Sequence, residues 1–309
     1  MSKIFEALQK TEGEVADLAR PLLTQTAGET PKTGGEDRQD AAVPGAHEGA
    51  EASPAIASTV EIPDTQEDVA AYPPAGGGRI RTVPIRLSAD APMLPFDDKH
   101  SRAGEQYRVA RTKLLHHPRQ PRMVVISSAG SGDGKTVTAI NLAGALALKS
   151  EEQVLLVDAD LRRSQIAGLL GISNSPGLAD VLSGGCALED AIVRLEQFPN
   201  FCVLPGGKPI TNPTELLDSS RWATLCAAVR RQYRYVVFDT PPLATVADYD
   251  LIQAHCDGVV LVVRPDHTNR KLCLQAIEMV PKERLVGVLM NCVRDWFLWK
   301  TRDYYYAGN

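Results

Sequence analysis

The sequence predicts an α/β fold, in which helices cover both faces of a doubly wound, mainly parallel sheet. Short aliphatic runs recur from residue 123 onward without alternation of apolar and polar positions, and such runs are typical of strands that are buried on both faces. Segments of helical length separate the runs, as in folds built from alternating strands and helices. The predicted strands cover residues 123–126, 154–157, 201–204, 235–238, 258–263 and 285–290.

The region before the predicted sheet has a different composition. Residues 1–23 place apolar side chains among charged ones in an irregular amphipathic helix pattern. Residues 24–86 are dominated by Gly, Pro, Ala, Thr and acidic residues, and such a segment buries too little apolar surface to offset its ordering entropy. We therefore predict an N-terminal helix at 1–23, a disordered linker at 24–86, a folded domain at 87–292 and a C-terminal tail at 293–309.

Charge and cysteine content narrow the possible environments. The formal net charge is −5, so no global basic field indicates a nucleic-acid partner. The six cysteines are scattered and form no Cys-x-x-Cys pair, which favours free thiols in a reducing compartment. No segment approaches the roughly 20 apolar residues that a membrane-spanning helix needs. We expect a cytoplasmic protein that reaches a membrane, if it does, through a partner.

A glycine-rich turn follows the first predicted strand and precedes a predicted helix. It matches the P-loop pattern Gly-x-x-x-x-Gly-Lys-Thr, except that Ala129 replaces the first glycine. In such a turn consecutive amides and the helix N-terminus face the phosphates, Lys135 neutralises them, and the Thr136 hydroxyl can bind Mg²⁺. A glycine-rich turn with an exposed lysine is the alternative, which the strand-turn-helix context disfavours. The predicted nucleotide-binding residues are Gly130, Ser131, Gly132, Asp133, Gly134, Lys135, Thr136 and Val137.

Acidic residues follow two other predicted strands. Asp158 and Asp160 come directly after the strand at 154–157, and Asp239 comes after the strand at 235–238. Ligands of parallel α/β sheets bind beyond the carboxyl ends of the strands, so we expect these acids to meet the P-loop there. Asp239 has the position of a Walker B carboxylate. The predicted Mg²⁺ ligands are Thr136, Asp158, Asp160 and Asp239.

Further motifs extend the pattern to most of the chain after residue 95. Glu105, Arg108 and Arg111 form a Glu-x-x-Arg-x-x-Arg ridge on one predicted helix, and residues 212–217 read Asn-Pro-Thr-Glu-Leu-Leu. A cluster of three tyrosines, Tyr304, Tyr305 and Tyr306, lies near the C-terminus. Together with the three nucleotide motifs, this order and spacing resembles the bacterial tyrosine kinases (BY-kinases) of capsule and exopolysaccharide synthesis.

The resemblance implies a P-loop kinase that uses ATP and Mg²⁺ to phosphorylate its own tyrosine cluster. It implies that Lys135 stabilises the transferred phosphoryl group, that Asp158 is the base or a metal ligand, and that Asp160 is a metal ligand. It further implies that Arg162 is a supporting cation and Asn291 an adenine contact. A simple turn residue is an equal alternative for Asn291.

The same resemblance implies partners. Glu105, Arg108 and Arg111 would assemble a homo-oligomeric ring, in which the tail of one subunit enters the site of its neighbour. A separate transmembrane activator of polysaccharide chain length or export would recruit the kinase to the inner face of the membrane. A tyrosine phosphatase would reverse the modification.

Two other functions stay open at this point. A P-loop switch ATPase of the cell-division and plasmid-partitioning type would share the sheet and the metal carboxylates, but it carries a signature lysine where this chain has Gly130. A non-catalytic protein that binds nucleotide in order to assemble would use the three tyrosines as an aromatic patch. The tyrosine tail and the intact acids favour the kinase.

Overall fold

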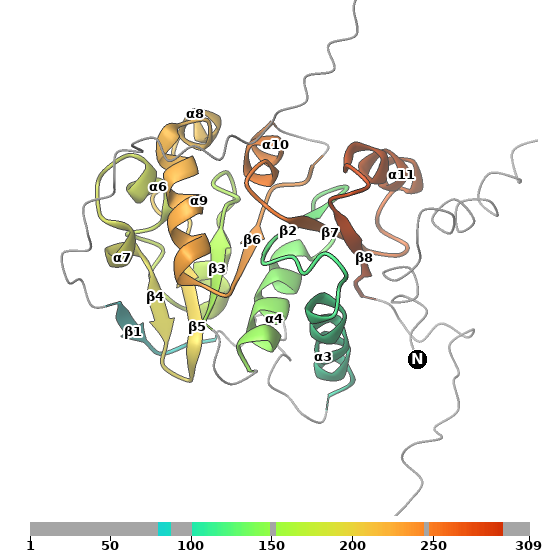
Figure 1. Ribbon diagram of the computed structural model, residues 1–309, viewed down its shortest axis with the longest axis horizontal. Helices are drawn as coiled ribbons and strands as arrows, with labels where there is room; N and C mark the ends of the chain where they lie inside the picture. The colour runs from blue at the N-terminus through green and yellow to red at the C-terminus, as the bar shows by residue number, and fades with distance from the viewer. Residues whose placement is uncertain (1–79, 88–100, 149–152, 244–246, 293–309) are drawn as a thin grey trace, which may run out of the picture.

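The computed structural model describes residues 80–87, 101–148, 153–243 and 247–292. The expected N-terminal helix, most of the expected linker and the tyrosine cluster lie outside these described residues. Within them the chain forms one sheet flanked by helices (Figure 1). None of the helices in this part of the chain combines the length and the apolar character that crossing a membrane requires.

The predicted α/β class is confirmed. The sheet has eight strands in the order β1-β4-β5-β3-β6-β2-β7-β8, and its neighbouring strands are parallel except for the antiparallel pair β4 and β5. All six predicted strands are present. The strands are β1 (Arg81–Val83), β2 (Met123–Ser128), β3 (Val154–Asp158), β4 (Val193–Leu195), β5 (Phe198–Leu204), β6 (Tyr235–Asp239), β7 (Gly258–Val263) and β8 (Leu285–Met290).

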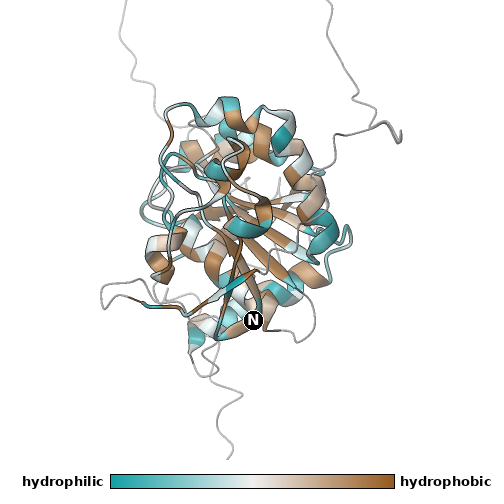
Figure 2. Ribbon diagram, turned by 90° about the vertical axis from the view of Figure 1, so that its left-hand side faces the viewer, coloured by the Kyte–Doolittle hydropathy of each residue, from teal (hydrophilic) through white to brown (hydrophobic). Residues whose placement is uncertain are grey.

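Helices pack on both faces of the sheet (Figures 1 and 2). Successive residues of β2 belong to different core clusters. Val124 lies in the cluster that also contains residues of α3, α4 and α5, whereas Val125 lies in the cluster that contains residues of α6 to α11. This double burial explains why the predicted strands show no alternation of polarity. The helices are α3 (Arg102–Leu115), α4 (Lys135–Ala147), α5 (Ile166–Leu170), α6 (Leu178–Leu182), α7 (Leu188–Ala191), α8 (Pro213–Leu217), α9 (Ser220–Gln232), α10 (Asp248–Gln253) and α11 (Arg270–Met279).

Strand β1 changes one expected boundary. Residues 81–83, which the composition assigned to the linker, pair in parallel with β4 at the edge of the sheet. The segment continues over the domain, because the backbone N–H of Arg86 donates to the carbonyl oxygen of Leu170 at 3.0 Å. Two of its three strand residues are exposed, so no apolar run marked it in the sequence. The ordered domain therefore begins before residue 87.

The register of the central strands positions the site. Strand β2, which leads into the glycine-rich turn, lies between β6 and β7, and β3 pairs with β6. This pairing sets Asp158 directly beside Asp239. All of these strands are parallel, so their carboxyl ends share one edge of the sheet. The expected meeting of the acids with the turn follows from this register.

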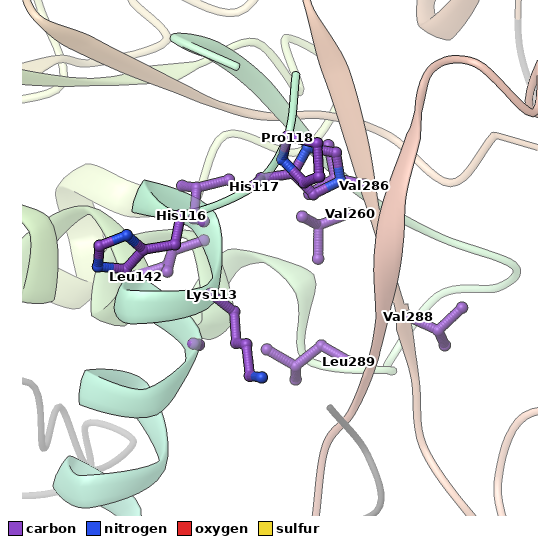
Figure 3. Close-up of a pocket in the computed structure, with 11 residues that line it drawn as sticks. Lys113, His116, His117, Pro118, Leu142, Val260, Val286, Val288 and Leu289 are labelled. Atoms are coloured by element: carbon purple, nitrogen blue, oxygen red, sulfur yellow. The ribbon is translucent and has the colours of Figure 1, made fainter. Parts of the chain in front are cut away.

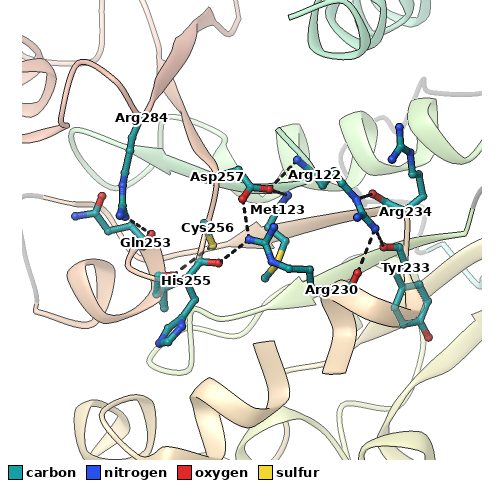
Figure 4. A network of polar contacts seen from close by, with 11 residues as sticks. Arg122, Met123, Arg230, Tyr233, Arg234, Gln253, His255, Cys256, Asp257 and Arg284 are labelled. Carbon is teal, nitrogen blue, oxygen red and sulfur yellow. Dashed lines mark hydrogen bonds and ion pairs between the residues drawn. The ribbon is translucent and has the colours of Figure 1, made fainter. Parts of the chain in front are cut away.

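The opposite, amino edge of the sheet is held by a polar network around Asp257 (Figure 4). One oxygen of Asp257 accepts hydrogen bonds from the backbone N–H groups of Arg122 and Met123, at 2.9 and 2.8 Å. The other oxygen pairs with the Arg230 guanidinium at 2.7 Å. The Arg122 guanidinium reaches back to the carbonyl oxygens of Arg230, Tyr233 and Arg234 at the end of α9.

This network predicts a pH-dependent contribution to stability. Burial alone would raise the pKa of Asp257, but the Arg230 pair and the two backbone donors outweigh it and lower the pKa. A lowered carboxyl pKa stabilises the fold above the unfolded value of about 3.9, and this stabilisation is lost as the pH falls through the folded value. We expect Asp257→Asn to lower the free energy of unfolding at pH 7 by about 1.5–3 kcal/mol.

Urea denaturation of wild type and Asp257→Asn between pH 7 and pH 3 measures this contribution. The difference between the two proteins should stay constant down to about pH 5 and shrink below about pH 4. Asp250→Asn on the exposed side of α10 is the control and should leave the unfolding free energy nearly unchanged. A difference that does not vary with pH would show that the Asp257 charge is not the source of the stabilisation.

Candidate active site

The glycine-rich turn connects β2 to α4, as the sequence predicted. Gly132 and Gly134 have φ values of 85° and 88°, in the left-handed region that favours glycine. A Cβ atom at Gly134 would also collide with the side-chain amide of Asn291. Gly134 caps α4 without a side-chain hydrogen bond, so the N-cap residue itself does not occupy the first amides of the helix. Such amides bind anions.

Lys135, the first residue of α4, points toward the acids. Its ammonium nitrogen lies 3.2 Å from Oδ2 of Asp160, and both side chains are largely buried, with exposed fractions of 14% and 4%. The backbone N–H of Arg163 donates to the other Asp160 oxygen at 3.1 Å. The structure therefore brings the P-loop lysine and the second acid of the Asp158–Asp160 motif into one ion pair.

Asp239 is buried at the end of β6 with unfilled hydrogen-bonding capacity. Neither of its carboxylate oxygens has a well-formed hydrogen bond from any residue in the described part of the chain. Burial raises its pKa to about 8, although the positive charge of Lys135 opposes the shift; Asp158 and Asp160 raise the pKa further. A buried carboxylate of this kind is a suitable ligand for a cation.

Asp158 has two oxygens in different environments. Oδ2 accepts hydrogen bonds from Ser164 Oγ at 2.8 Å and from the backbone N–H groups of Gln165 and Ile166 at 3.1 and 3.0 Å. These contacts fix the turn that leads into α5. Oδ1 is buried and lacks a hydrogen-bond partner among the described residues. Burial raises the pKa of Asp158 to about 6, against the lowering effect of these hydrogen bonds.

Arg162 has partners away from the P-loop. Its guanidinium makes a two-point contact with Asp248 on α10, at 2.7 and 3.1 Å, and donates to the Thr214 hydroxyl at 3.0 Å. The Thr214 hydroxyl in turn donates to Asp248 at 2.6 Å. Burial raises the pKa of Asp248, but the contacts with Arg162 and Thr214 dominate and lower it. The network joins the Asp158–Asp160 loop to α8, and sequence reasoning did not identify Asp248.

Asn291 lies against the P-loop. Its Nδ2 donates to the carbonyl oxygen of Asp133 at 2.9 Å, and its backbone N–H donates to the carbonyl oxygen of Val263 at 2.8 Å. The end of β8 is thereby attached to both the P-loop and β7. Asn291 therefore lies next to the P-loop, and its role as an adenine contact stays a prediction.

The charged ridge on α3 is separate from the acids. Glu105 and Arg108 form an exposed ion pair of 2.7 Å along the helix, and the Arg111 guanidinium donates to the carbonyl oxygen of Ala145 near the end of α4 at 3.1 Å. Behind this helix, a small apolar cavity of about 40 Å³ lies between α3 and strands β7 and β8 (Figure 3). None of the P-loop residues or acids of the site lines that cavity.

The donor set fits a magnesium ion that is shared with a nucleotide. Mg²⁺ is usually held by one or two carboxylates, waters and phosphate oxygens. Asp239 offers two oxygens that receive no well-formed hydrogen bond from the described residues, and the Thr136 hydroxyl is close enough to lower its pKa. Within the described ranges, no group of three or more His, Cys, Asp or Glu side chains forms a ready-made metal site. A phosphate-bearing ligand would have to complete the coordination.

Known proteins with similar sequences and structures were found for this chain. A family model described as an AAA domain matches residues 121–281. Tyrosine-protein kinase YwqD of Bacillus subtilis (strain 168) is 34% identical over 220 residues, which are 70% of this chain and 91% of YwqD. Tyrosine-protein kinase CpsD of Streptococcus agalactiae is 31% identical over 194 residues, 62% of this chain and 84% of CpsD. The kinase domain of Escherichia coli tyrosine kinase ETK superposes with a TM-score of 0.59 at 26% identity, covering 70% of this chain and 92% of that domain.

The environment of Asp239 predicts a variant that is more stable than wild type. Because its pKa is raised to about 8, the folded protein holds a proton that the unfolded chain releases, and stability falls as the pH rises between about 4 and 8. Asp239→Asn removes this cost. We expect a gain on the order of 1–3 kcal/mol at pH 8, measured by urea denaturation without nucleotide and with EDTA. A stability equal to or below that of wild type would contradict it.

The Arg162 network predicts coupled effects. Arg162→Ala and Asp248→Asn should each lower the free energy of unfolding by about 1–2 kcal/mol, discounted because the arginine side chain is 41% exposed. The double variant should lose less than the sum, because both changes remove one interaction. Urea denaturation of the four proteins gives this cycle. Effects that add to within about 0.5 kcal/mol would show that the pair does not stabilise the domain.

Proposed function

Since this chain belongs to the bacterial tyrosine kinase family, we propose that it transfers the γ-phosphoryl group of ATP to Tyr304, Tyr305 and Tyr306 of its own tail. The ion pair between Lys135 and Asp160 carries the proposal. It sets a P-loop cation beside the acids at the carboxyl ends of β3 and β6, where a phosphoryl group needs charge neutralisation and a base.

The P-loop would bind the phosphates. The backbone amides from Ser131 to Gly134 and the first amides of α4 would hold them, while the Gly130 amide donates to Asp133. Lys135 would turn from Asp160 to the transferred group. Thr136 and Asp239 would hold Mg²⁺, with Asp160 as a further ligand directly or through water. Asp158 would be either another ligand or the base. The metal ion supplies additional neutralisation of the phosphate charge.

Asp158 is our candidate for the base. Its Oδ1 has no hydrogen-bond partner among the described residues, whereas its Oδ2 is held by the turn that leads into α5. A pKa near 6 leaves the carboxylate ionised at neutral pH, yet more basic than an exposed aspartate. A tyrosine hydroxyl presented to this edge of the sheet would transfer its proton to Asp158 Oδ1 as its oxygen attacks the γ-phosphorus of ATP. The bond from the γ-phosphorus to the β–γ bridging oxygen would break, and ADP would leave.

The tail can reach a site in the same subunit or in a neighbour. Asn291 and Tyr304 are thirteen residue steps apart, which span about 43 Å when extended at ~3.3 Å per step. We propose transfer between subunits of a ring assembled through Glu105, Arg108 and Arg111, of which Glu105 and Arg108 form an exposed ion pair. Three phosphates would add roughly −5 charges beside the acids, so phosphorylation would expel the tail and loosen the ring.

The proposed context is polysaccharide synthesis or export at the cytoplasmic side of a membrane. A transmembrane activator would recruit the kinase, a tyrosine phosphatase would reset it, and Asn291 would contribute to the adenine site. The opening segment, residues 2–8, is similar to that of cytosolic kinases encoded with polysaccharide export machinery. This similarity is the support for the membrane partner.

Mixing two variants, one without the acceptor tyrosines and one without the P-loop lysine, tests transfer between subunits. The donor is the variant Tyr304→Phe, Tyr305→Phe, Tyr306→Phe, which keeps the site; the acceptor is Lys135→Ala, which keeps the tail. We expect phosphotyrosine on the Lys135→Ala protein only when both are incubated with ATP and Mg²⁺, as read by mass spectrometry. Light scattering should show wild type dissociating with ATP while the donor variant stays assembled.

The controls separate the alternatives. Wild type alone is the positive control, and each variant alone should gain no tail phosphate. Phosphate on wild type but never on the mixed acceptor would place the reaction within one subunit. Release of ADP without phosphotyrosine in any sample, even with a membrane extract added, would instead support a switch ATPase.

A further inference from the structure

Three successive carbonyl groups of the P-loop meet donors from the ends of β7 and β8. The carbonyl oxygen of Ser131 lies 3.3 Å from Nε2 of His267, and that of Gly132 accepts from the Arg264 guanidinium at 3.4 Å. The carbonyl oxygen of Asp133 accepts from Asn291 at 2.9 Å. Arg264 and His267 belong to the segment between β7 and α11. The P-loop is thus contacted along one side by a single neighbouring region.

A second set of contacts holds the loop through the Asp133 side chain. The Thr268 hydroxyl donates to Asp133 Oδ1 at 2.7 Å and accepts from the backbone N–H of Arg264 at 2.8 Å. Asp133 Oδ2 accepts from the backbone N–H of Gly130 at 3.3 Å. Asp133 itself is 1% exposed. A buried carboxylate therefore spans the loop from Gly130 to the β7–α11 segment.

The geometry of the peptide bond gives these contacts a consequence for ligand binding. In a trans peptide the carbonyl of one residue and the N–H of the next point in opposite directions. Donors that hold the carbonyl groups of residues 131–133 therefore direct the amides of Gly132, Asp133 and Gly134 away from the β7–α11 segment and the end of β8. That is the side on which a phosphate would be bound by the loop.

We propose that Thr268 is a positioning residue for the nucleotide phosphates, acting through Asp133 on the amides of the P-loop. Without the Thr268 hydroxyl, Asp133 Oδ1 loses the hydrogen bond that ties it to the β7–α11 segment. The loop must then rearrange to hydrate or re-pair the buried oxygen, and its amides no longer converge before the ligand arrives. The proposal rests on the nucleotide binding of the proposed function and goes beyond it in assigning Thr268.

Binding of a fluorescent ADP analogue, with Mg²⁺ and the full chain, tests the proposal. Thr268→Val keeps the shape but lacks the hydroxyl, and we expect its Kd to rise about tenfold. Thr268→Ser keeps the hydroxyl and should stay within about twofold of wild type. Thr224→Val, the same change at a partly exposed position of α9, is the matched control and should bind as wild type does.

Two further measurements separate positioning from a general loss of structure. Hydrogen exchange without nucleotide should rise in the peptides that contain residues 129–137 and 264–268 of Thr268→Val, since the hydroxyl also accepts from the backbone N–H of Arg264, and it should stay unchanged elsewhere. Arg264→Met removes the donor to Gly132 without touching Asp133, and its Kd should rise about threefold; this variant decides the question if Thr268→Val does not fold.

The outcomes of these assays are distinct from those of the kinase assay. Wild-type affinity in Thr268→Val, or an equal loss in Thr268→Ser, would overturn the positioning role of Thr268. If Thr268→Val does not fold, wild-type affinity in Arg264→Met would overturn the alignment of the P-loop amides by the β7–α11 segment. If wild type binds the ADP analogue but forms no phosphotyrosine, the proposed kinase reaction fails while the role of Thr268 stands. In steady-state assays of an active kinase, Thr268→Val should raise KM for ATP with little change in kcat.

Discussion

The ion pair between Lys135 and Asp160 links the two halves of the site. It joins the first residue of the P-loop helix to the loop after β3, at a place where Asp158 and Asp239 are also buried. Three carboxylates so close together repel one another and lack the solvation of water. The lysine offsets part of that cost, and the raised pKa values of Asp158 and Asp239 show that the compensation is partial.

Much of this arrangement could be predicted because it follows from strand polarity. Apolar runs that end in Asp158, Asp239 and the P-loop must bring these residues to one edge once the strands are parallel. The strands contribute residues to two core clusters. This confirms that they are buried on both faces, which is what the uninterrupted aliphatic runs predicted. The order of motifs also sufficed to identify the kinase family. These features depend on local sequence and on one topological rule.

Contacts between loops could not be predicted in the same way. The partner of Arg162 is Asp248, which is 86 residues away, and the partner of Asp133 is Thr268, which is 135 residues away. Neither partner lies in a motif, and a single threonine or aspartate at the end of a helix is most often a cap or a surface residue. Strand β1 was missed for a related reason. It is a strand because it pairs with β4, whereas its own residues, two of which are exposed, form no apolar run that would indicate one.

The two edges of the sheet place their acids in different environments. At the amino edge, Asp257 receives two backbone donors and a guanidinium, so its charge is satisfied within the fold. At the carboxyl edge, Asp239 is the last residue of β6, but its oxygens receive no well-formed hydrogen bond from the described residues. Asp239, which has no such hydrogen bonds among the described residues, therefore lowers the stability of the domain. A cation brought by a ligand would repay that cost, so occupancy of the site and stability of the domain are thermodynamically linked.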